Sequence, residues 1–436
     1  MKVRSHPFCT PLSAAGKTRP TPSRAIFAST RTMWALLLLL ACASSPGAGA
    51  ASRVLVVGGS GRVGGSAVRA LVKRDVRVDV AGRSVENWQS YLQRARGVDA
   101  DFAARSGQVG FRQFDFTDAM QRESVLPGYD LVVNTAGPFQ GLSSPDLLEA
   151  CLTLGIQYVD VCDDIALSRV ARSTKFQVLA KEHKASAIIS AGIWPGISSL
   201  LAQSLIERVV TEEGETPKSV KFNFFTAGSG GAGETILTAT FLLLGEDVLV
   251  YNDGEPTYLK TATDALTRDF GPFPGLGPRS VARLNLIECE SCFNSQKSKF
   301  PNLSVETRFG TAPAFWNTLF LAMAQLVPQS VLRDRAAMRV LALVSLPAVR
   351  LVDSFVGSAN GIQVEVQTTS GSTHSALLSH ADLEDEVGQC LADFAVALLS
   401  HDSGQAGIWF PEEIPSSPAR QSILQKSCAR ALVFRQ

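Results

Sequence analysis

A short apolar run near residue 55 leads directly into a glycine-rich turn. Residues 53–57 read RVLVV, and the next residues, Gly59-Ser60-Gly61-Arg62-Val63-Gly64, have the spacing G-x-G-x-x-G and open a stretch of helical periodicity. In this order Gly59 suits a tight turn, Gly61 a close approach of backbone to phosphate, and Gly64 the packing of helix on strand. The helix N-terminus adds N–H donors and a partial positive charge. The pattern therefore predicts a dinucleotide site.

The residues that follow the second predicted strand indicate which dinucleotide is bound. Sites for NAD place an acidic residue about 20 residues after the glycines, where it accepts from the ribose 2′-hydroxyl. Here that strand ends in Ala81-Gly82-Arg83-Ser84. A guanidinium matches phosphate oxygens bidentately, so Arg83, with Ser84 as a hydroxyl donor, predicts NADP. Asp79 lies inside the strand and is the candidate for NAD, and Asp115, at the end of the third strand, is the candidate for the adenine.

Small residues follow the fourth predicted strand, in the loop Ala136-Gly137-Pro138-Phe139. A loop of this kind at the carboxyl end of a central strand lies over the cofactor in doubly wound sheets. Tyr158 and Asp160 alternate along the fifth strand and so share a face, which makes them candidates for the proton donor and its orienting partner. The alternative is a buried tyrosine hydrogen-bonded within the fold. None of the tyrosines has Lys four residues later, which argues against a Tyr-x-x-x-Lys reductase.

Several of these segments, taken in order, resemble the saccharopine dehydrogenase-like oxidoreductases. The glycine turn, the AGRS segment at 81–84, the NTAGPF segment at 134–139 and the E-A-C…G…Y-V-D stretch from Glu149 to Asp160 carry the resemblance over residues 53 to 200. Later segments, such as GIWFPEE at 407–413, are similar to a plant and cyanobacterial branch. The resemblance implies NAD(P)-linked hydride transfer at a C=N or C=C bond of a small molecule.

The sequence departs from the family before the Pro195-Gly196 pair. Members that process amino acids tend to have Asp at the preceding position, where this chain has Trp194. A tryptophan beside the nicotinamide suits an apolar or flat substrate better than an amino-acid-derived imine. Gly230, in the glycine-rich loop at 228–233, and Arg308 are further candidates for substrate binding.

Strands alternate with helical stretches up to about residue 196, and longer alternating strands follow. The first pattern predicts an α/β fold with a Rossmann-type parallel sheet, and the second an α+β domain with a largely antiparallel sheet. We expect a leader at 1–52, a dinucleotide domain at 53–196, a substrate and dimerisation domain at 197–380, and a helical segment at 381–436 that returns to the first domain. A homodimer would form through the second domain.

The leader differs in composition from the rest of the chain. Residues 1–52 hold six Lys and Arg and no Asp or Glu, and residues 33–43 form an apolar run too short to span a bilayer. We expect a cleaved transit peptide for a plastid, such as the chloroplast, or for another organelle; the alternative is a secretory signal that starts at Met33. Without these residues the net charge is 1 − 6 = −5, which argues against a nucleic-acid partner.

Two further features bear on metals and membranes. Cys289 and Cys292 form a CxxC pair, but no second pair or nearby histidine completes a zinc site. We therefore expect no metal and interpret them as two thiols near a strand end. The apolar stretch at 338–356 is interrupted by Pro347, Arg350 and Asp353, and we interpret it as a buried helix pair, with peripheral membrane contact as the alternative.

The leading hypothesis for function is an NADP(H)-dependent oxidoreductase; the alternative is a noncatalytic NADP(H)-binding or membrane-associated protein that retains the fold.

Overall fold

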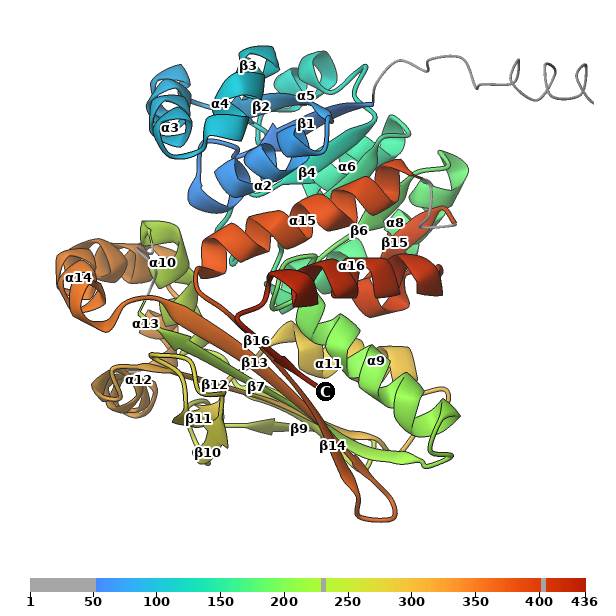
Figure 1. Cartoon of the computed structure of the whole chain (residues 1–436), viewed down its shortest axis with the longest axis vertical. Helices are drawn as coiled ribbons and strands as arrows, with labels where there is room; N and C mark the ends of the chain where they lie inside the picture. The colour runs from blue at the N-terminus through green and yellow to red at the C-terminus, as the bar shows by residue number, and fades with distance from the viewer. Residues whose placement is uncertain (1–51, 229–232, 401–404) are drawn as a thin grey trace, which may run out of the picture. The chain divides into compact units, whose positions relative to one another are not determined.

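The computed structural model describes residues 52–228, 233–400 and 405–436, and residues 52–436 form one compact unit. Its first layer is a seven-stranded, wholly parallel sheet in the order β15-β6-β5-β4-β1-β2-β3. This confirms the predicted Rossmann-type sheet, which lies in the upper half of Figure 1. The strands are β1 (Arg53–Val57), β2 (Arg77–Gly82), β3 (Gly110–Gln113), β4 (Leu131–Asn134), β5 (Gln157–Asp160), β6 (Ser186–Ile188) and β15 (Gly407–Trp409).

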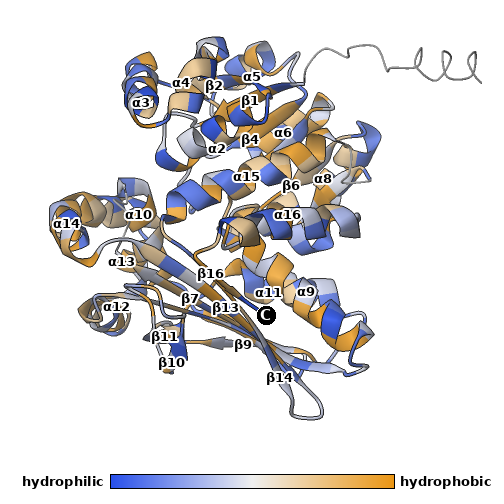
Figure 2. Cartoon of the chain, viewed as in Figure 1, coloured by the Kyte–Doolittle hydropathy of each residue, from blue (hydrophilic) through white to orange (hydrophobic). Residues whose placement is uncertain are grey.

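Helices cover both faces of this sheet, which explains why its central strands are apolar on both sides. Leu55 packs with α6 and α8, whereas Val54 and Val56 pack with α2 and α15. The apolar strands stand out in Figure 2. The helices around the sheet are α2 (Arg62–Lys73), α3 (Val85–Val98), α4 (Ala100–Arg105), α5 (Ala119–Val125), α6 (Asp146–Thr153), α7 (Ile165–Ala171), α8 (Thr174–Glu182), α15 (Leu383–Leu399) and α16 (Ser417–Arg430).

The second layer is a nine-stranded mixed sheet. Its main path runs β10-β11-β12-β7-β13-β14-β16, with β8 and β9 attached beside β12. Only the pairing of β12 with β7 is parallel among its described strands, which confirms the predicted largely antiparallel sheet. The strands are β7 (Pro217–Ala227), β8 (Val248–Asn252), β9 (Glu255–Leu259), β10 (Leu266–Asp269), β11 (Pro278–Arg283), β12 (Ser304–Ala312), β13 (Ala359–Thr368), β14 (Thr373–His380) and β16 (Val433–Arg435).

One apolar cluster connects the two layers. It runs from β1 and α2 through α15 to residues such as Phe222 and Ile362 on the second sheet. The final segment of the chain joins both sheets, because β15 pairs with β6 whereas β16 pairs with β14. The remaining helices are α9 (Ile197–Thr211), α10 (Glu234–Leu243), α11 (Ile287–Gln296), α12 (Phe315–Leu326), α13 (Gln329–Leu332) and α14 (Arg335–Val356).

Two local interpretations of the sequence are wrong. The stretch at 338–356 is not a buried helix pair but part of one continuous helix, α14, which contains Pro347 and leaves a row of apolar side chains exposed. Cys289 and Cys292 do not lie at a strand end but are buried on α11. Among the described residues no helix combines the length and apolar character that crossing a bilayer requires.

Candidate active site

The glycine turn after β1 brings the start of α2 against the end of β4. Gly58 has φ of +81°, and a Cβ on Gly64 would lie 2.3 Å from the carbonyl oxygen of Gly58 and 2.5 Å from Oγ1 of Thr135. Gly61, the N-cap of α2, has no side chain that could cap this helix. The start of α2 therefore leaves room for an anion, which is the geometry that a dinucleotide pyrophosphate needs.

The structural roles of the first two glycines differ from those that the motif predicts. The left-handed backbone is at Gly58, which the sequence analysis did not single out, and Gly59 has no positive φ. A Cβ on Gly59 would instead lie 2.9 Å from Cγ1 of Val80 on β2. Gly58 permits the turn and Gly59 permits close packing between the turn and the neighbouring strand.

Arg83 and Ser84 directly follow β2, as predicted. Arg83 is exposed, and the Ser84 hydroxyl caps α3. Asp79, the candidate for NAD, is buried inside β2, where its Oδ2 accepts from the hydroxyl of Tyr129 at 2.6 Å and from Arg53 at 2.7 Å. Asp79 therefore has a structural role inside the strand. Arg83 is exposed at the strand end, where a 2′-phosphate would lie.

Asp115 lies beside Arg83 at the same edge of the sheet. Hydrogen bonds from the Thr117 side chain and backbone lower the pKa of Asp115, and the charge of Arg83 lowers it further. Its Oδ1 accepts from Thr117 N at 3.0 Å and Thr117 Oγ1 at 2.7 Å, so one carboxylate oxygen serves the local turn.

A cleft lies beyond the carboxyl ends of these strands and is closed from the other side by the second sheet and its helices. It encloses about 330 Å³ and has mostly apolar walls. From the first sheet it is lined by Val63 of the glycine turn and by the loop after β4. Other residues that line it include Thr135, Gly137, Pro138, Phe139, Gln140, Asp163, Trp194, Thr226, Ile236, Thr240, Leu286, Glu288, Phe309, Trp316, Phe320, Val349 and Glu384.

Three carboxyl groups that line this cleft have raised pKa values: Asp163, Glu288 and Glu384. Burial raises the pKa of Glu288 to about 7, and the Asp163 carboxylate adds to the shift. Oε1 of Glu288 accepts from the Ser198 hydroxyl at 2.9 Å, whereas Oε2 is buried without a hydrogen-bond partner among the described residues. Burial also raises the pKa of Asp163 to about 6, against the opposing effect of Gln140. Such groups can hold or release a proton near neutral pH.

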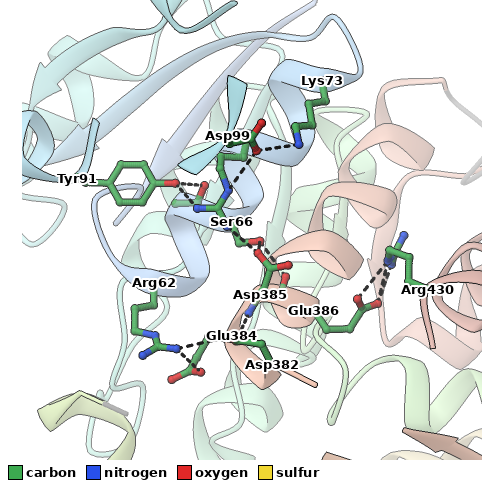
Figure 3. Close-up of polar contacts among 12 residues, drawn as sticks. Arg62, Ser66, Lys73, Tyr91, Asp99, Asp382, Glu384, Asp385, Glu386 and Arg430 are labelled. Carbon is green, nitrogen blue, oxygen red and sulfur yellow. Dashed lines mark hydrogen bonds and ion pairs between the residues drawn. The ribbon is translucent and has the colours of Figure 1, made fainter. Parts of the chain in front are cut away.

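The amino-terminal end of α15 reaches the other side of the dinucleotide turn (Figure 3). Nη2 of Arg62 lies 3.1 Å from Oε2 of Glu384, and the Ser66 hydroxyl lies 2.7 Å from Oδ1 of Asp385. A Cβ on Gly388 would lie 2.5 Å from Cβ of Ser66, so α15 and α2 are closely packed. Burial raises the pKa of Glu384 to about 7, although the Arg62 charge opposes this. A titratable acid thus adjoins the phosphate-binding turn.

The predicted catalytic pair lies elsewhere. Tyr158 and Asp160 do share a face of β5, but they line a separate, small cavity beside α6 and α7 and not the cleft. The Tyr158 hydroxyl accepts from Asn134 Nδ2 at 3.0 Å, and Oδ1 of Asp160 accepts from the backbone N–H groups of Cys162 and Ser190. These bonds hold loops at the sheet edge, which matches the alternative of a buried, structural tyrosine.

The remaining predicted residues are divided among several places. Gly137, Pro138, Phe139 and Trp194 line the cleft, whereas Ala136 lines the small cavity. The Trp194 ring lies 5.6 Å from that of Phe224.

Two residues of the second domain, Arg308 and Gly230, were predicted to bind substrate, and neither is found among the described residues that line the cleft. Arg308 is almost fully buried, and its guanidinium lies 2.6 Å from Asp264 and 2.9 Å from Glu306. It does not line the cleft. Gly230 lies outside the described residues.

Sequence reasoning missed the carboxyl groups of the cleft. Asp163 follows the carboxyl end of β5, and this position was an available signal because that edge of a parallel sheet carries the site. Glu288 lies in the second domain, where no motif marks it. Among the described residues no cluster of three or more His, Cys, Asp or Glu could hold a metal ion.

Comparisons with known proteins agree with this geometry. Residues 54–192 match the family model "Saccharopine dehydrogenase NADP binding domain". This match supports the family resemblance and the binding of NADP by the first sheet. The search of curated proteins found no match.

Two solved structures extend the comparison to most of the chain. An apo saccharopine dehydrogenase (L-Glu forming) from Saccharomyces cerevisiae is 14% identical with a TM-score of 0.59, over 88% of this chain and 99% of that one. This match shows that the two proteins share a fold that includes both layers. A meso-dapdh mutant with DAP from Clostridium tetani E88 is 13% identical over 85% of this chain and 95% of that one, but its TM-score of 0.39 is too low to support an argument.

Proposed function

We propose that this protein is an NADP(H)-dependent oxidoreductase that transfers hydride between the nicotinamide and a small, largely apolar organic substrate at a C=N or C=C bond. The observation that carries the proposal is that one cleft brings together the dinucleotide turn, the loop after β4 and the protonatable carboxyl groups of Asp163 and Glu288. The comparisons support the NADP-binding part, and the substrate class rests on the cleft alone.

The residues present fit an NADP(H) molecule. Positions 58 and 64 leave no room for a Cβ, which keeps the turn open for the pyrophosphate, and Arg83 is exposed at the strand end for the 2′-phosphate. When bound, the cofactor would supply or accept the hydride. Phe139 and Trp194 would confine the reacting parts between apolar surfaces and exclude water.

Glu288 and Asp163 would donate or accept the proton that accompanies the hydride. In the reducing direction a protonated carboxyl donates to the atom that gains negative charge, and in the oxidising direction the carboxylate accepts that proton. Oε2 of Glu288 is available for this step because Ser198 holds only Oε1. The mostly apolar walls favour a substrate without charged groups, since an unpaired charge would lose its hydration there.

The test is single-turnover oxidation of NADPH by the purified protein with a panel of apolar imines and enones, followed at the nicotinamide absorbance. The proposal predicts oxidation with at least one apolar class and transfer of deuterium from C4-deuterated NADPH into the product. NADPH binding without oxidation across the panel would favour the second candidate, a noncatalytic NADP(H)-binding protein. The observation in favour of that candidate is that Trp194 stands where amino-acid-processing relatives tend to have Asp.

A further inference from the structure

Two neighbouring helices of the second domain leave a row of large apolar side chains in solvent. On α14 the exposed positions recur every three to four residues and so form one face of the helix. Figure 2 shows α14 and α12 at the edge of the second domain. The exposed fractions are Val340 61%, Leu343 47%, Val344 73%, Leu351 63% and Phe355 82% on α14, and Phe315 51%, Leu319 43% and Leu326 80% on α12.

The opposite faces of these helices are already used. Met338, Ala342 and Val349 of α14 are buried, and Val349 also lines the cleft together with Phe320 of α12. The outward apolar residues therefore do not complete the core of this chain. Contiguous apolar surface of this kind marks an interaction site.

The charges around this surface indicate what it contacts. Residues 313–357 contain four Arg and two Asp, although the chain after residue 52 carries a net charge of −5. Arg339 and Arg350 are exposed on α14. Arg339 also forms a surface ion pair with Glu234 of α10, which anionic headgroups can replace because such pairs are weak. Asp353 is partly buried and lines the cleft. An apolar helix face flanked by arginines is typical of helices that lie in the interface of a membrane with anionic lipids.

We propose that the exposed faces of α12 and α14 dock on a lipid bilayer surface that carries anionic headgroups. At 22 residues, α14 is about 33 Å long and can lie flat in the headgroup region. Its apolar residues enter the acyl boundary while Arg339 and Arg350 extend to the headgroups. Docking does not depend on the proposed reaction.

The test is flotation of the full chain with phosphatidylcholine vesicles, with and without phosphatidylglycerol. We expect the protein to float with the vesicles that contain phosphatidylglycerol. The double variant Val344→Asp/Phe355→Asp should lose roughly tenfold or more in vesicle affinity, because two apolar side chains no longer enter the bilayer. Arg339→Gln/Arg350→Gln should lose the dependence on phosphatidylglycerol.

The matched control is Val98→Asp/Met120→Asp, which places the same charges at exposed apolar positions of the first domain and should bind as the unmodified protein does. Thermal unfolding of each variant shows that it is folded. Three results would overturn the proposal: no flotation with either vesicle, equal binding by the Val344→Asp/Phe355→Asp variant, or a lipid-free dimer that this variant converts to a monomer. The last result would assign the surface to a second copy of the chain.

Discussion

The guanidinium of Arg62 lies 3.1 Å from the carboxylate of Glu384, although 322 residues separate them in the chain. The contact joins the first residue of α2 to the first turn of α15, so a segment far from the glycine motif forms part of the dinucleotide site (Figure 3). It also places an acid with a pKa of about 7 beside a turn suited to phosphates. The cofactor site is therefore built by both ends of the described chain.

Replacing Glu384 by Gln should strengthen NADPH binding severalfold at pH 8. The ionised carboxylate repels the cofactor phosphates and holds Arg62, and the amide removes both effects. Because burial raises the pKa of Glu384 to about 7, its charge fades as the pH falls through 7, and the difference between the two proteins should shrink by pH 6. Fluorescence titration with NADPH at both pH values measures this.

The control for the Glu384 prediction is Glu386→Gln, which makes the same change of charge on α15 at a residue bonded to Arg430. It should leave the affinity for NADPH unchanged. Equal affinities of Glu384→Gln and the unmodified protein at pH 8 would show that Glu384 is too far from the phosphates to act on them.

Replacing Gly64 by Ala should abolish measurable NADPH binding and lower stability by about 1–3 kcal/mol, because the new Cβ would overlap the carbonyl oxygen of Gly58. Gly97→Ala on α3 is the matched control, since a Cβ there meets nothing within 4 Å, and it should be neutral or slightly stabilising. Urea unfolding and NADPH titration of both variants test this. A Gly64→Ala protein that binds NADPH normally would exclude the turn as the pyrophosphate site.

Replacing Glu288 by Gln should lower kcat about 100-fold or more and leave the affinity for NADPH unchanged, as expected for loss of a general acid. In the reducing direction the acid must be protonated, so kcat should fall as the pH rises through about 7, and this limb should vanish in the variant. Glu412→Gln is the control, since burial likewise raises the pKa of Glu412 to about 7 but this residue does not line the cleft. An unchanged alkaline limb in Glu288→Gln would shift the role to another carboxyl group of the cleft, Asp163 or Glu384, in each of which burial also raises the pKa.

Local patterns in the sequence were enough to predict the parallel sheet and the cofactor turn. The strand before Gly59, the glycine spacing and the position of Arg83 depend on neighbours close in the chain, where strand and helix periodicity are strong. The second sheet was predicted only in outline. Strands β9 and β10 are short, partly exposed and of mixed sequence, and the apolar β8 spans only five residues, so none of them has a clear strand periodicity.

The proton-handling part of the site could not be predicted in the same way. Tyr158 and Asp160 share a strand face as expected, but which face of β5 meets the cleft depends on how the second domain packs. Burial raises the pKa of Glu288, and Ser198, which donates a hydrogen bond to its carboxylate, is distant in the sequence. The exposed face of α14 was likewise interpreted as buried, because apolar content alone does not distinguish core from surface.

The most direct test of the central claim is calorimetric titration of the protein with NADPH and NADH, beside Arg83→Ala and the control Arg77→Ala. Arg77 is exposed at the opposite end of the same strand. The account predicts that NADPH binds more tightly than NADH and that Arg83→Ala lowers only the affinity for NADPH, by roughly 10- to 100-fold, through loss of charge-assisted bonds to the 2′-phosphate. Arg77→Ala should change neither affinity. Equal binding of NADPH by Arg83→Ala, or binding of neither nucleotide, would contradict the proposed cofactor site.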